Sequence, residues 1–416
     1  MTLKKKNQIF FATLIVFIVT FCLIGCSVKK NVDENKETKK EAKPEKKVEK
    51  IIAKHQEENM KLTMELFKNS YNSKGNVVIS PVAVQMGLAF IMNGAVGLTQ
   101  TEIINKVGME APVFNNYLKT YIEESPKDVR GSVNFVNAIW LNSLNEGMDL
   151  KNGYEDRAIE YLNAQIKSEP FSSGYETVIN NWIKEETDGM VNTIMKKTDP
   201  LTWLYTVNVA TFAMDWANSY NVEDITKGQF KNFNNQVTNV EMMSSVESLY
   251  IEDNQVTGFI KDYYNPRYKF VAIMPDETIQ LDAYVKNWDA RKAKKLLEGA
   301  SNENVKVTFP KFDSAATVNM RTVLMRIGLK NLYSMDANLS GLLEDGKTIE
   351  LENMIHTSAV SIGKKSSEAK IFTEVDSKKA DKSYTKEITI NRPFLYLIYD
   401  TEEGIPLFIG SVKVLQ

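Results

Sequence analysis

Hydrophobic residues recur at helical spacing in three segments of the first half of the chain. Residues 59–72 and 178–189 each place apolar side chains along one face, which predicts two helices that bury one side. Residues 80–95 are almost wholly apolar, so a buried helix is predicted there. Pro81 is well placed to open that helix and Gly94 to help end it.

Strand patterns dominate the rest of the chain. The clearest apolar or alternating runs are residues 133–141, 203–216, 269–277, 304–312, 393–400 and 405–415. The last two are nearly all apolar, as expected for strands buried on both faces. Helices first and strands later predict an α+β fold built around large sheets.

A long connection separates two of these strand regions, from residue 351 to residue 392. A connection of that length inside a compact domain is usually functional or disordered. Its segment "SSEAKIFTEVDS", residues 366–377, has no Gly or Pro, and only Phe372 breaks a regular alternation with charged residues. The small or apolar positions are Ser367, Ala369, Ile371, Thr373 and Val375. A segment that reads as a loop therefore carries the pattern of a half-buried strand.

The N-terminus has the pattern of a targeting signal. Three lysines precede an apolar run over residues 9–25, which is shorter than the roughly 20 residues that a spanning helix needs. The "LIGC" that ends at Cys26 resembles the lipobox of bacterial lipoproteins. This resemblance implies that residues 1–25 are a signal peptide and that Cys26 receives lipid. An uncleaved signal anchor is the alternative.

Residues 27–54 are rich in Lys and Glu and poor in aromatic residues, so they cannot bury enough surface to fold. We expect residues 26–54 to be a lipidated cysteine on a disordered tether, whose root-mean-square reach is roughly 30 Å. The signal carries three lysines, and residues 27–54 carry ten lysines against six acids. Of the chain's net charge of −2, residues 55–416 therefore carry −9. An acidic body argues against nucleic acid as a partner.

The folded part has few residues for catalysis. Cys22 would leave with the signal and Cys26 would be lipidated, so no disulfide, thiolate or cysteine-metal chemistry is expected. His55 and His356 are the only histidines, and the sequence contains no GxSxG, HExxH or phosphate-binding glycine loop. We therefore expect no metal or cofactor, and an enzyme is the weakest of the function classes.

Several segments resemble a known family. Residues 76–103, "NVVISPVAVQMGLAFIMNGAVGLTQTEI", resemble the N-terminal signature of the serpins, and residues 392–412, "RPFLYLIYDTEEGIPLFIGSV", resemble the C-terminal one. Segments between them match in the same order: residues 134–142, 179–191, 207–217, 239–243, 270–277, 307–312 and 323–342. The resemblance runs from about residue 55 to the end, which implies one serpin domain over residues 55–416.

The resemblance implies the serpin fold, with a helix-rich N-terminal half, three β-sheets and an exposed reactive loop at about residues 364–390. In serpins a target protease cleaves this loop and is held as an acyl-enzyme while the cut loop inserts into the central sheet. That would explain why the loop carries a strand pattern. It implies a monomeric inhibitor of serine proteases, or secondarily cysteine proteases, anchored outside a bacterial membrane, and not an enzyme.

Four residues match positions that control sheet opening in this family. Ser80, Asn208 and His356 match the hydrogen-bonded residues under the middle of the central sheet, called the shutter. Trp216 matches the tryptophan at the top of the sheet, where insertion begins, called the breach. Each could instead be an ordinary core residue.

The predicted hinge departs from the family pattern. Inhibitory serpins typically have an acid, then Gly-Thr, then alanines. Here Lys364 replaces the acid, and bulky residues stand where small ones are usual. The hinge residues are Ser366, Ser367, Glu368, Ala369, Lys370, Ile371 and Phe372. Slow insertion would let the protease escape, so a non-inhibitory serpin-fold binding or structural lipoprotein is the alternative function.

The scissile bond is expected near the end of the same loop. A lysine there would suit a trypsin-like or lysine-cleaving protease, and an alanine would suit an elastase-like one. The candidates are Lys378, Lys379, Ala380 and Lys382. The same run, "SKKADK", could equally be a solvated charged loop tip.

Overall fold

The computed structural model describes residues 44–351, 354–363 and 383–416, with side chains from Lys54 onward. Residues Met60–Gln416 form one compact unit and Met1–Asn59 are assigned to another. Helix α2 (Pro44–Ser70) begins inside the segment predicted to be a disordered tether. Lys, Glu and Ala favour helices, and proline is tolerated in a first turn, which accounts for the difference. The predicted signal, Cys26 and the first part of the tether lie outside the described residues.

Nine α-helices and two short 3₁₀ helices occur in the described parts of the chain. After α2 they are α3 (Pro81–Gly94), α4 (Leu98–Val107), α5 (Ala111–Glu124), α6 (Asn152–Leu162), α7 (Glu176–Glu186), α8 (Leu281–Asn287), α9 (Ala290–Glu298), α10 (Met320–Arg326), η1 (Val222–Asp224) and η2 (Asn331–Tyr333). Among the described residues, no helix is long and apolar enough to cross a membrane.

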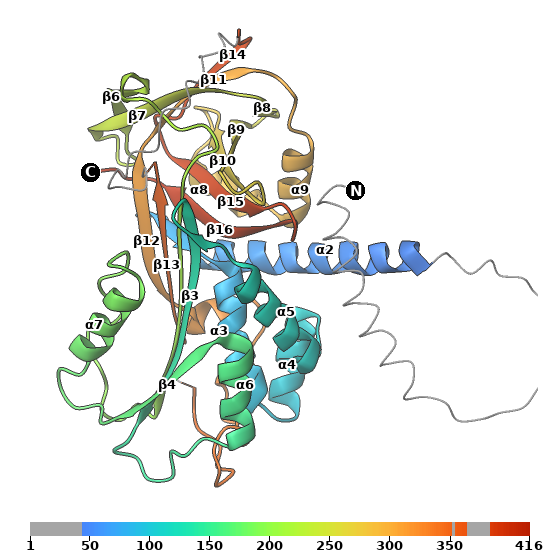
Figure 1. Cartoon of the computed structure of the whole chain (residues 1–416), viewed down its shortest axis with the longest axis vertical. Coiled ribbons are helices and arrows are strands. Elements are labelled where there is room, and N and C mark those ends of the chain that lie inside the picture. Colours follow the sequence, from blue (N-terminus) through green and yellow to red (C-terminus); the bar gives the residue numbers. More distant parts are fainter. Residues whose placement is uncertain (1–43, 352–353, 364–382) are drawn as a thin grey trace, which may run out of the picture. The chain divides into compact units, whose positions relative to one another are not determined.

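The strands form three sheets (Figure 1). The central sheet has the order β12-β13-β5-β3-β2, with β4 also paired to β3: β2 (Lys127–Asp128), β3 (Gly131–Asn142), β4 (Ala164–Glu169), β5 (Leu204–Met214), β12 (Phe312–Asn319) and β13 (Met354–Ile362). The second sheet has the order β1-β16-β15-β10-β9-β8: β1 (Val77–Ile79), β8 (Leu249–Glu252), β9 (Val256–Asp262), β10 (Tyr268–Pro275), β15 (Phe394–Asp400) and β16 (Ile405–Val412). The third has the order β14-β11-β7-β6: β6 (Ile225–Lys231), β7 (Val237–Glu247), β11 (Val305–Pro310) and β14 (Lys386–Thr389).

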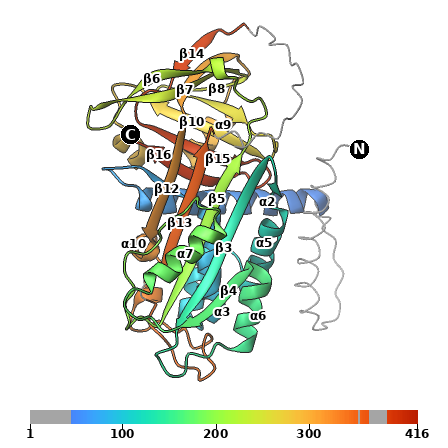
Figure 2. The same cartoon turned by 60° about the vertical axis from the view of Figure 1, so that its left-hand side comes forward.

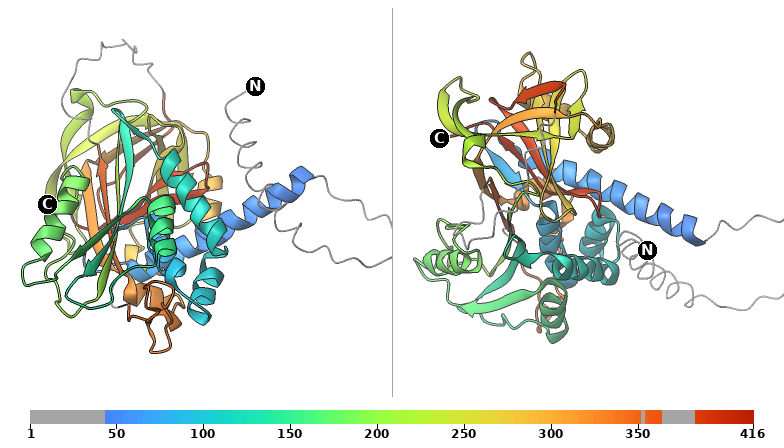
Figure 3. Two further views of the ribbon diagram at one scale, coloured as in Figure 1. Left: turned by 60° about the horizontal axis from the view of Figure 1, so that its bottom comes forward. Right: turned by 45° about the horizontal axis from the view of Figure 1, so that its top comes forward.

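Helix α3 lies behind the central sheet and has no exposed face. All of its residues are buried, because it packs between that sheet and β16 while α4, α5 and α6 surround it (Figure 3). Helix α7 covers the opposite face of the sheet (Figure 2). The inner strands β3 and β5 are therefore buried on both faces along most of their length, which explains why apolar residues such as those at 138–141 follow one another without alternation.

The prediction of one long connection from residue 351 to residue 392 is wrong in part. The structure places β13 and β14 inside this segment. Strand β13, "MIHTSAVSI", is buried although it is rich in polar residues, so neither an alternating nor an apolar pattern marks it. Strands β6, β8 and β9 were not predicted either, and the run over residues 304–312 divides between β11 and β12.

Candidate functional site

The pairing of β5 with β13 is the candidate functional site. We call this pairing the seam: residues 206–213 of β5 pair in parallel with residues 354–361 of β13. The other neighbours along the path from β12 to β2 are antiparallel. A parallel pair in the middle of an antiparallel sheet leaves room in the topology for a strand that would be antiparallel to both neighbours.

The chain continues from the end of β13 into residues 364–382 and returns as β14 in a different sheet. Gly363, at the end of β13, has φ +94°, and an added Cβ there would lie 2.8 Å from the sulfur of Met243 and 2.9 Å from Cγ of Lys311. Only glycine fits this turn without strain. The predicted hinge and scissile residues, 366–372 and 378–382, lie outside the described residues, so their structural roles remain predictions.

His356 belongs to the third of the eight residue pairs of the seam and is fully buried. The backbone N–H of Ser80 donates to its Nε2 at 3.1 Å, and the hydroxyl of Ser358 lies 2.9 Å from the same nitrogen. Because Nε2 accepts a hydrogen bond from a backbone N–H, the ring must be neutral with its proton on Nδ1. Burial lowers the pKa of His356 to about 3, and the backbone of Asn208 opposes only part of that shift.

Ser80 links this histidine to α3. It is the N-cap of that helix, and its hydroxyl accepts from the N–H of Ala83 at 3.3 Å. This is the usual reason for serine at a helix start. Ser80 thus caps the start of the helix that lies behind the seam and also binds the imidazole of His356.

Asn208 lies beside His356 in register on the other strand. Its Nδ2 donates to Oδ1 of Asn137 on β3 at 2.8 Å, and Nδ2 of Asn137 donates to the carbonyl of Leu162 at 2.9 Å. Helix α3 approaches so closely here that a Cβ added to Gly87 would lie 2.6 Å from Oδ1 of Asn208. The structure therefore brings Ser80, Asn208 and His356 together, and their role in sheet opening stays a prediction.

Side-chain hydrogen bonds fasten each strand of the seam to its outer neighbour. On one side, Thr357 bonds Thr317 at 2.9 Å and Ser361 donates to Asp313 at 2.6 Å, joining β13 to β12. On the other side, the asparagine pair described above joins β5 to β3. Among the described residues no hydrogen bond joins a side chain of β5 to a side chain of β13. The imidazole of His356 meets the backbone of Asn208 across the seam, and backbone bonds and packing hold the rest.

Trp216 lies just beyond the end of β5 and is almost completely buried. It stacks on Tyr263, with ring centroids 4.4 Å apart and planes 9° apart, and Nζ of Lys261 lies 5.3 Å from its ring. Lys261 is only 2% exposed, and its ammonium pairs with Glu247 at 2.7 Å. A buried charge is costly unless it is paired, so this ion pair and the aromatic rings form one packed unit.

Sequence analysis missed the ion pair of Lys261 and Glu247. A signal existed, because Phe259, Lys261 and Tyr263 are spaced by two and so share one face of a strand. A lysine between two inward aromatic residues indicates a buried cation. Asn137 gave no comparable signal, since its partners Leu162 and Asn208 come from other segments. Ser358 lies two residues from His356, but nothing in the sequence indicated that the two side chains meet.

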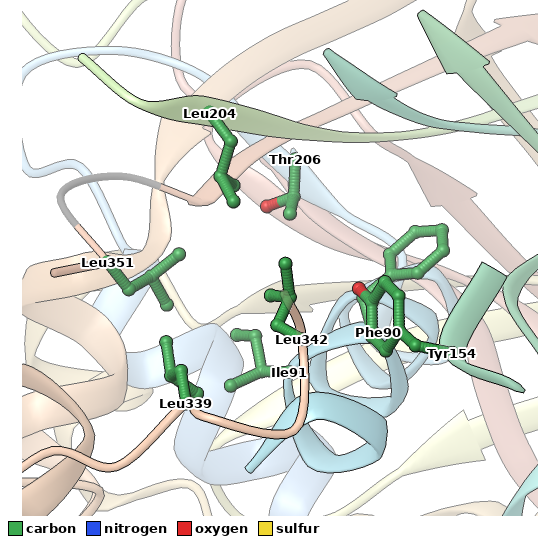
Figure 4. A pocket seen from close by; sticks show the side chains of 8 residues that line it. All are labelled: Phe90, Ile91, Tyr154, Leu204, Thr206, Leu339, Leu342 and Leu351. Carbon is green, nitrogen blue, oxygen red and sulfur yellow. The ribbon is translucent and has the colours of Figure 1, made fainter. Parts of the chain in front are cut away.

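Two small spaces adjoin the central sheet. The first is an apolar cavity of about 10 Å³ near the start of β5 (Figure 4), lined by Phe90, Ile91, Tyr154, Leu204, Thr206, Leu339, Leu342 and Leu351. It has room for no more than one water molecule. The second is a cleft of about 220 Å³ between β12 and the segment after α7, lined by Met190, Val191, Asn192, Thr193, Ala315, Ala316, Thr317 and Thr357. Neither lining contains a charged residue, and no group of acidic, His or Cys residues in the described part of the chain is placed to hold a metal.

Comparison with known proteins agrees with the fold and the resemblance. The family model described as serpin (serine protease inhibitor) matches residues 57–414. An uncharacterised serpin-like protein of Thermococcus kodakarensis is 28% identical over 362 residues, covering 84% of this chain and 83% of that protein. The thermophilic serpin tengpin is also similar. Its native-state crystal structure has a TM-score of 0.78 at 29% identity, covering 93% of this chain and 98% of that one, whereas its latent-state structure has 0.73 at 27%, covering 94% and 100%.

Proposed function

The chain belongs to the serpin family, whose members are generally serine protease inhibitors, and we propose that it acts by loop cleavage, covalent trapping and strand insertion. The observation that carries this proposal is the seam. Two central strands pair in parallel, and the segment predicted to be the reactive loop leaves from the end of one of them. A segment that folded back there would enter between β13 and β5 as an antiparallel strand.

Insertion would release free energy because one backbone ladder would be replaced by two. The seam holds eight residue pairs. A strand of the same length adds about eight net hydrogen bonds at roughly 1 kcal/mol each, so the gain is on the order of 10 kcal/mol before apolar burial is counted. Such energy stays stored only behind a kinetic barrier. The fastening of each seam strand to its outer neighbour means that opening would separate two intact halves of the sheet.

Cleavage is needed because the far end of the loop is anchored. Strand β14 pairs in parallel with β11, and Nζ of Lys386 lies 2.6 Å from a carboxylate oxygen of Glu252. A strand of eight residues spans about 26 Å, so the rest of an uncut loop would have to run back over the same distance to reach β14. A cut near Lys378–Lys382 would free the first part of the loop while β14 stays in place.

A non-inhibitory serpin is the second candidate, and the predicted hinge favours it. Lys370, Ile371 and Phe372 stand where small residues are usual, and trapping is a race between insertion and deacylation. Thr211 and Ser361 lie near the end of the seam from which the loop leaves, and both are small and buried. Bulky neighbours in an inserted strand would have to fit beside them.

We further propose that the mature chain is a lipoprotein held by Cys26 on the outer side of a bacterial membrane, and that it acts as a monomer. Support comes from the lipobox resemblance and from the Lys/Glu-rich segment that follows it. Mass spectrometry of the membrane fraction would test the anchor: a diacylated N-terminal cysteine is expected, and an intact residue 1 would refute it.

The inhibitory proposal is tested with the chain that lacks residues 1–26, which keeps every described element. It is incubated with a trypsin-like and an elastase-like serine protease, and an SDS-resistant adduct is sought. Mapping the cleaved bond then selects among the scissile candidates. Cleavage without any adduct for either protease would favour the non-inhibitory candidate.

A paired variant tests the hinge argument. Lys370→Ala with Phe372→Ala should raise the ratio of adduct to cleaved chain, because smaller residues insert faster. The matched control, Glu374→Ala with Asp376→Ala, alters the same loop beyond the hinge and should leave the ratio nearly unchanged. Equal effects of both pairs would contradict the bulk argument. A melting temperature that does not rise after loop cleavage would refute insertion itself.

A further inference from the structure

We propose that the exposed face of α9 is a docking surface for an anionic lipid bilayer. Four cationic side chains, Arg291, Lys292, Lys294 and Lys295, are exposed on this helix of nine residues. We call them the α9 basic face. The proposal concerns how the body is oriented at a membrane and is independent of protease inhibition.

The opposite side of α9 fixes the helix to the body. Ala293 and Leu296 are buried, and Ala290 and Leu297 pack against the main core. At the start of the helix, the carboxylate of Asp289 accepts from the N–H of Lys292 at 2.9 Å. The apolar side is therefore unavailable for insertion into lipid, and only the cationic side can meet a partner. Contact with a bilayer would be electrostatic and superficial.

A fifth cation extends the patch. Nζ of Lys292 donates to the carbonyl of Asn287 at 2.7 Å, which places this ammonium at the end of α8, next to the exposed Lys286. Five cationic residues thus occur within ten positions of the chain.

Few acidic groups neutralise these cations. Lys294 lies 3.8 Å from Glu298, with both side chains largely exposed, and such pairs contribute little. Asp282 on α8 pairs with the buried Lys413. Within the described residues, no acidic side chain lies within ion-pair distance of Arg291 or Lys295.

Because the body as a whole is acidic, the α9 basic face would determine which side of it approaches an anionic bilayer. Residues 55–416 carry a net charge of −9, so most of the surface is repelled by an anionic bilayer. Each Lys or Arg close to such a surface contributes about 1 kcal/mol of attraction, within a Debye length of about 8 Å. Only a local excess of positive charge, such as the α9 basic face, can approach it.

The predicted anchor explains why an anionic bilayer, and not another polyanion, is the proposed occupant. We expect lipid on Cys26 to keep the body near the membrane, because only residues 27–43 separate that cysteine from α2 and a flexible tether of that length has a root-mean-square reach of roughly 23 Å. At the resulting effective concentration, even weak electrostatic docking is populated. A soluble polyanion such as heparin carries similar charge, so the experiment includes it as a competing outcome.

The test uses the chain without residues 1–26, so that neither signal nor lipid contributes, in flotation with vesicles. One set contains equal parts of phosphatidylglycerol and phosphatidylcholine, and the other contains phosphatidylcholine alone. We expect binding to the anionic set only. It should disappear in 1 M salt, where the Debye length falls to about 3 Å. Binding to phosphatidylcholine alone, or binding that resists salt, would overturn the proposal.

Two charge-matched variants locate the surface. The first neutralises the α9 basic face by Arg291→Gln, Lys292→Gln, Lys294→Gln and Lys295→Gln, and it should bind anionic vesicles about tenfold more weakly or worse. The control removes four exposed lysines: Lys196→Gln and Lys197→Gln in the segment after α7, and Lys227→Gln and Lys231→Gln on β6. Figure 1 shows α7 and β6 on the left of the molecule and α9 on the right. Its affinity should change less than threefold or so, since only the net charge differs.

Several outcomes would reject the surface. Equal loss in the two variants would show that net charge alone governs binding. Retained affinity in the α9 variant would place the contact elsewhere, and binding to heparin without binding to vesicles would assign a different partner. Melting curves of both variants establish that the fold is intact. Because no protease is present, failure here leaves the inhibitory proposal unaffected.

Discussion

Protonation of His356, which is buried within the seam, should lower the free energy of unfolding. The imidazole is fully buried and accepts a hydrogen bond from the backbone of Ser80, so a second proton would break that bond and leave an unpaired charge in the interior. The perturbation is a fall in pH, compared between the wild-type chain and His356→Gln. Glutamine is neutral at every pH used and still offers an oxygen to the same N–H.

The magnitude follows from the two pKa values. In the folded state the pKa of His356 is lowered to about 3, whereas in the unfolded chain it stays near 6.5. Between these values the unfolded chain binds one more proton than the folded chain, so the free energy of unfolding falls as the pH falls. One pKa unit corresponds to about 1.4 kcal/mol. The histidine should therefore remove about 3 kcal/mol by pH 4 and approach about 5 kcal/mol near pH 3.

A second group titrates in the opposite direction over part of this range. Burial, together with the nearby Asp400, raises the pKa of Glu403 to about 7. Its stabilising contribution is complete below the unfolded value of 4.5 and is lost as the pH rises through 7. The pH profile of the wild-type chain alone is therefore ambiguous. The difference between the wild-type chain and His356→Gln cancels this contribution and isolates the histidine.

The assay is urea unfolding followed by tryptophan fluorescence at intervals from pH 7.5 to pH 4, on chains without residues 1–26. Where unfolding is not reversible, unfolding rates replace equilibrium free energies. The advantage of the wild-type chain over His356→Gln should shrink by about 3 kcal/mol across this range. A difference that stays constant with pH would show that His356 titrates normally or is not enclosed, and the account of the seam would be wrong.

Three further predictions concern neighbouring parts of the site. Gly363→Ala should lower the free energy of unfolding by more than about 1 kcal/mol, because it combines positive φ with contacts under 3 Å. Gly174→Ala, at similar φ but with no atom within 4 Å, is the matched control, and equal losses in urea unfolding would exclude the packing contribution. Lys261→Met should cost about 3–5 kcal/mol by leaving the mostly buried charge of Glu247 without a cation, although the hydroxyl of Ser245 still donates to it. Adding Glu247→Leu should recover most of this loss in the same assay, and no recovery would contradict the ion-pair explanation. Glu403→Gln should remove about 3 kcal/mol of pH dependence between pH 4.5 and pH 7, and an unchanged profile would exclude this group as its source.

Much of the fold was predictable because the apolar composition of single segments, together with residues such as a helix-start proline, indicates their secondary structure and burial. Helix α3 has a proline in its first turn and an apolar surface all round, and the paired strands β15 and β16 are almost entirely apolar. Such segments can be stable only in the interior, so their burial follows from composition. The same reasoning fails for β13, whose His, Thr and Ser side chains are buried because distant segments supply their partners.

The site was predictable only in part, for a related reason. Ser80, Asn208 and His356 were found through family resemblance, and the structure places them together. The bond from Ser80 to His356 joins positions 276 residues apart and the bond from Asn208 to Asn137 joins positions 71 apart, and no local pattern encodes such contacts. The exposed α9 basic face is visible in the sequence, but whether its apolar side is buried or free depends on the packing of the whole domain.

The division of side-chain hydrogen bonds around the seam gives a mechanical reason for where this sheet would open. Separating β13 from β12 would break the threonine pair and the bond from Ser361 to Asp313, and separating β5 from β3 would break the bond between Asn208 and Asn137. Separating β5 from β13 breaks backbone bonds that an inserted strand would remake on both sides. It also exposes Oδ1 of Asn208, which is buried without a hydrogen-bond partner among the described residues. Opening at the seam therefore has the smallest permanent loss of hydrogen bonds among these three strand pairings, and it is the one that a strand from the end of β13 could refill.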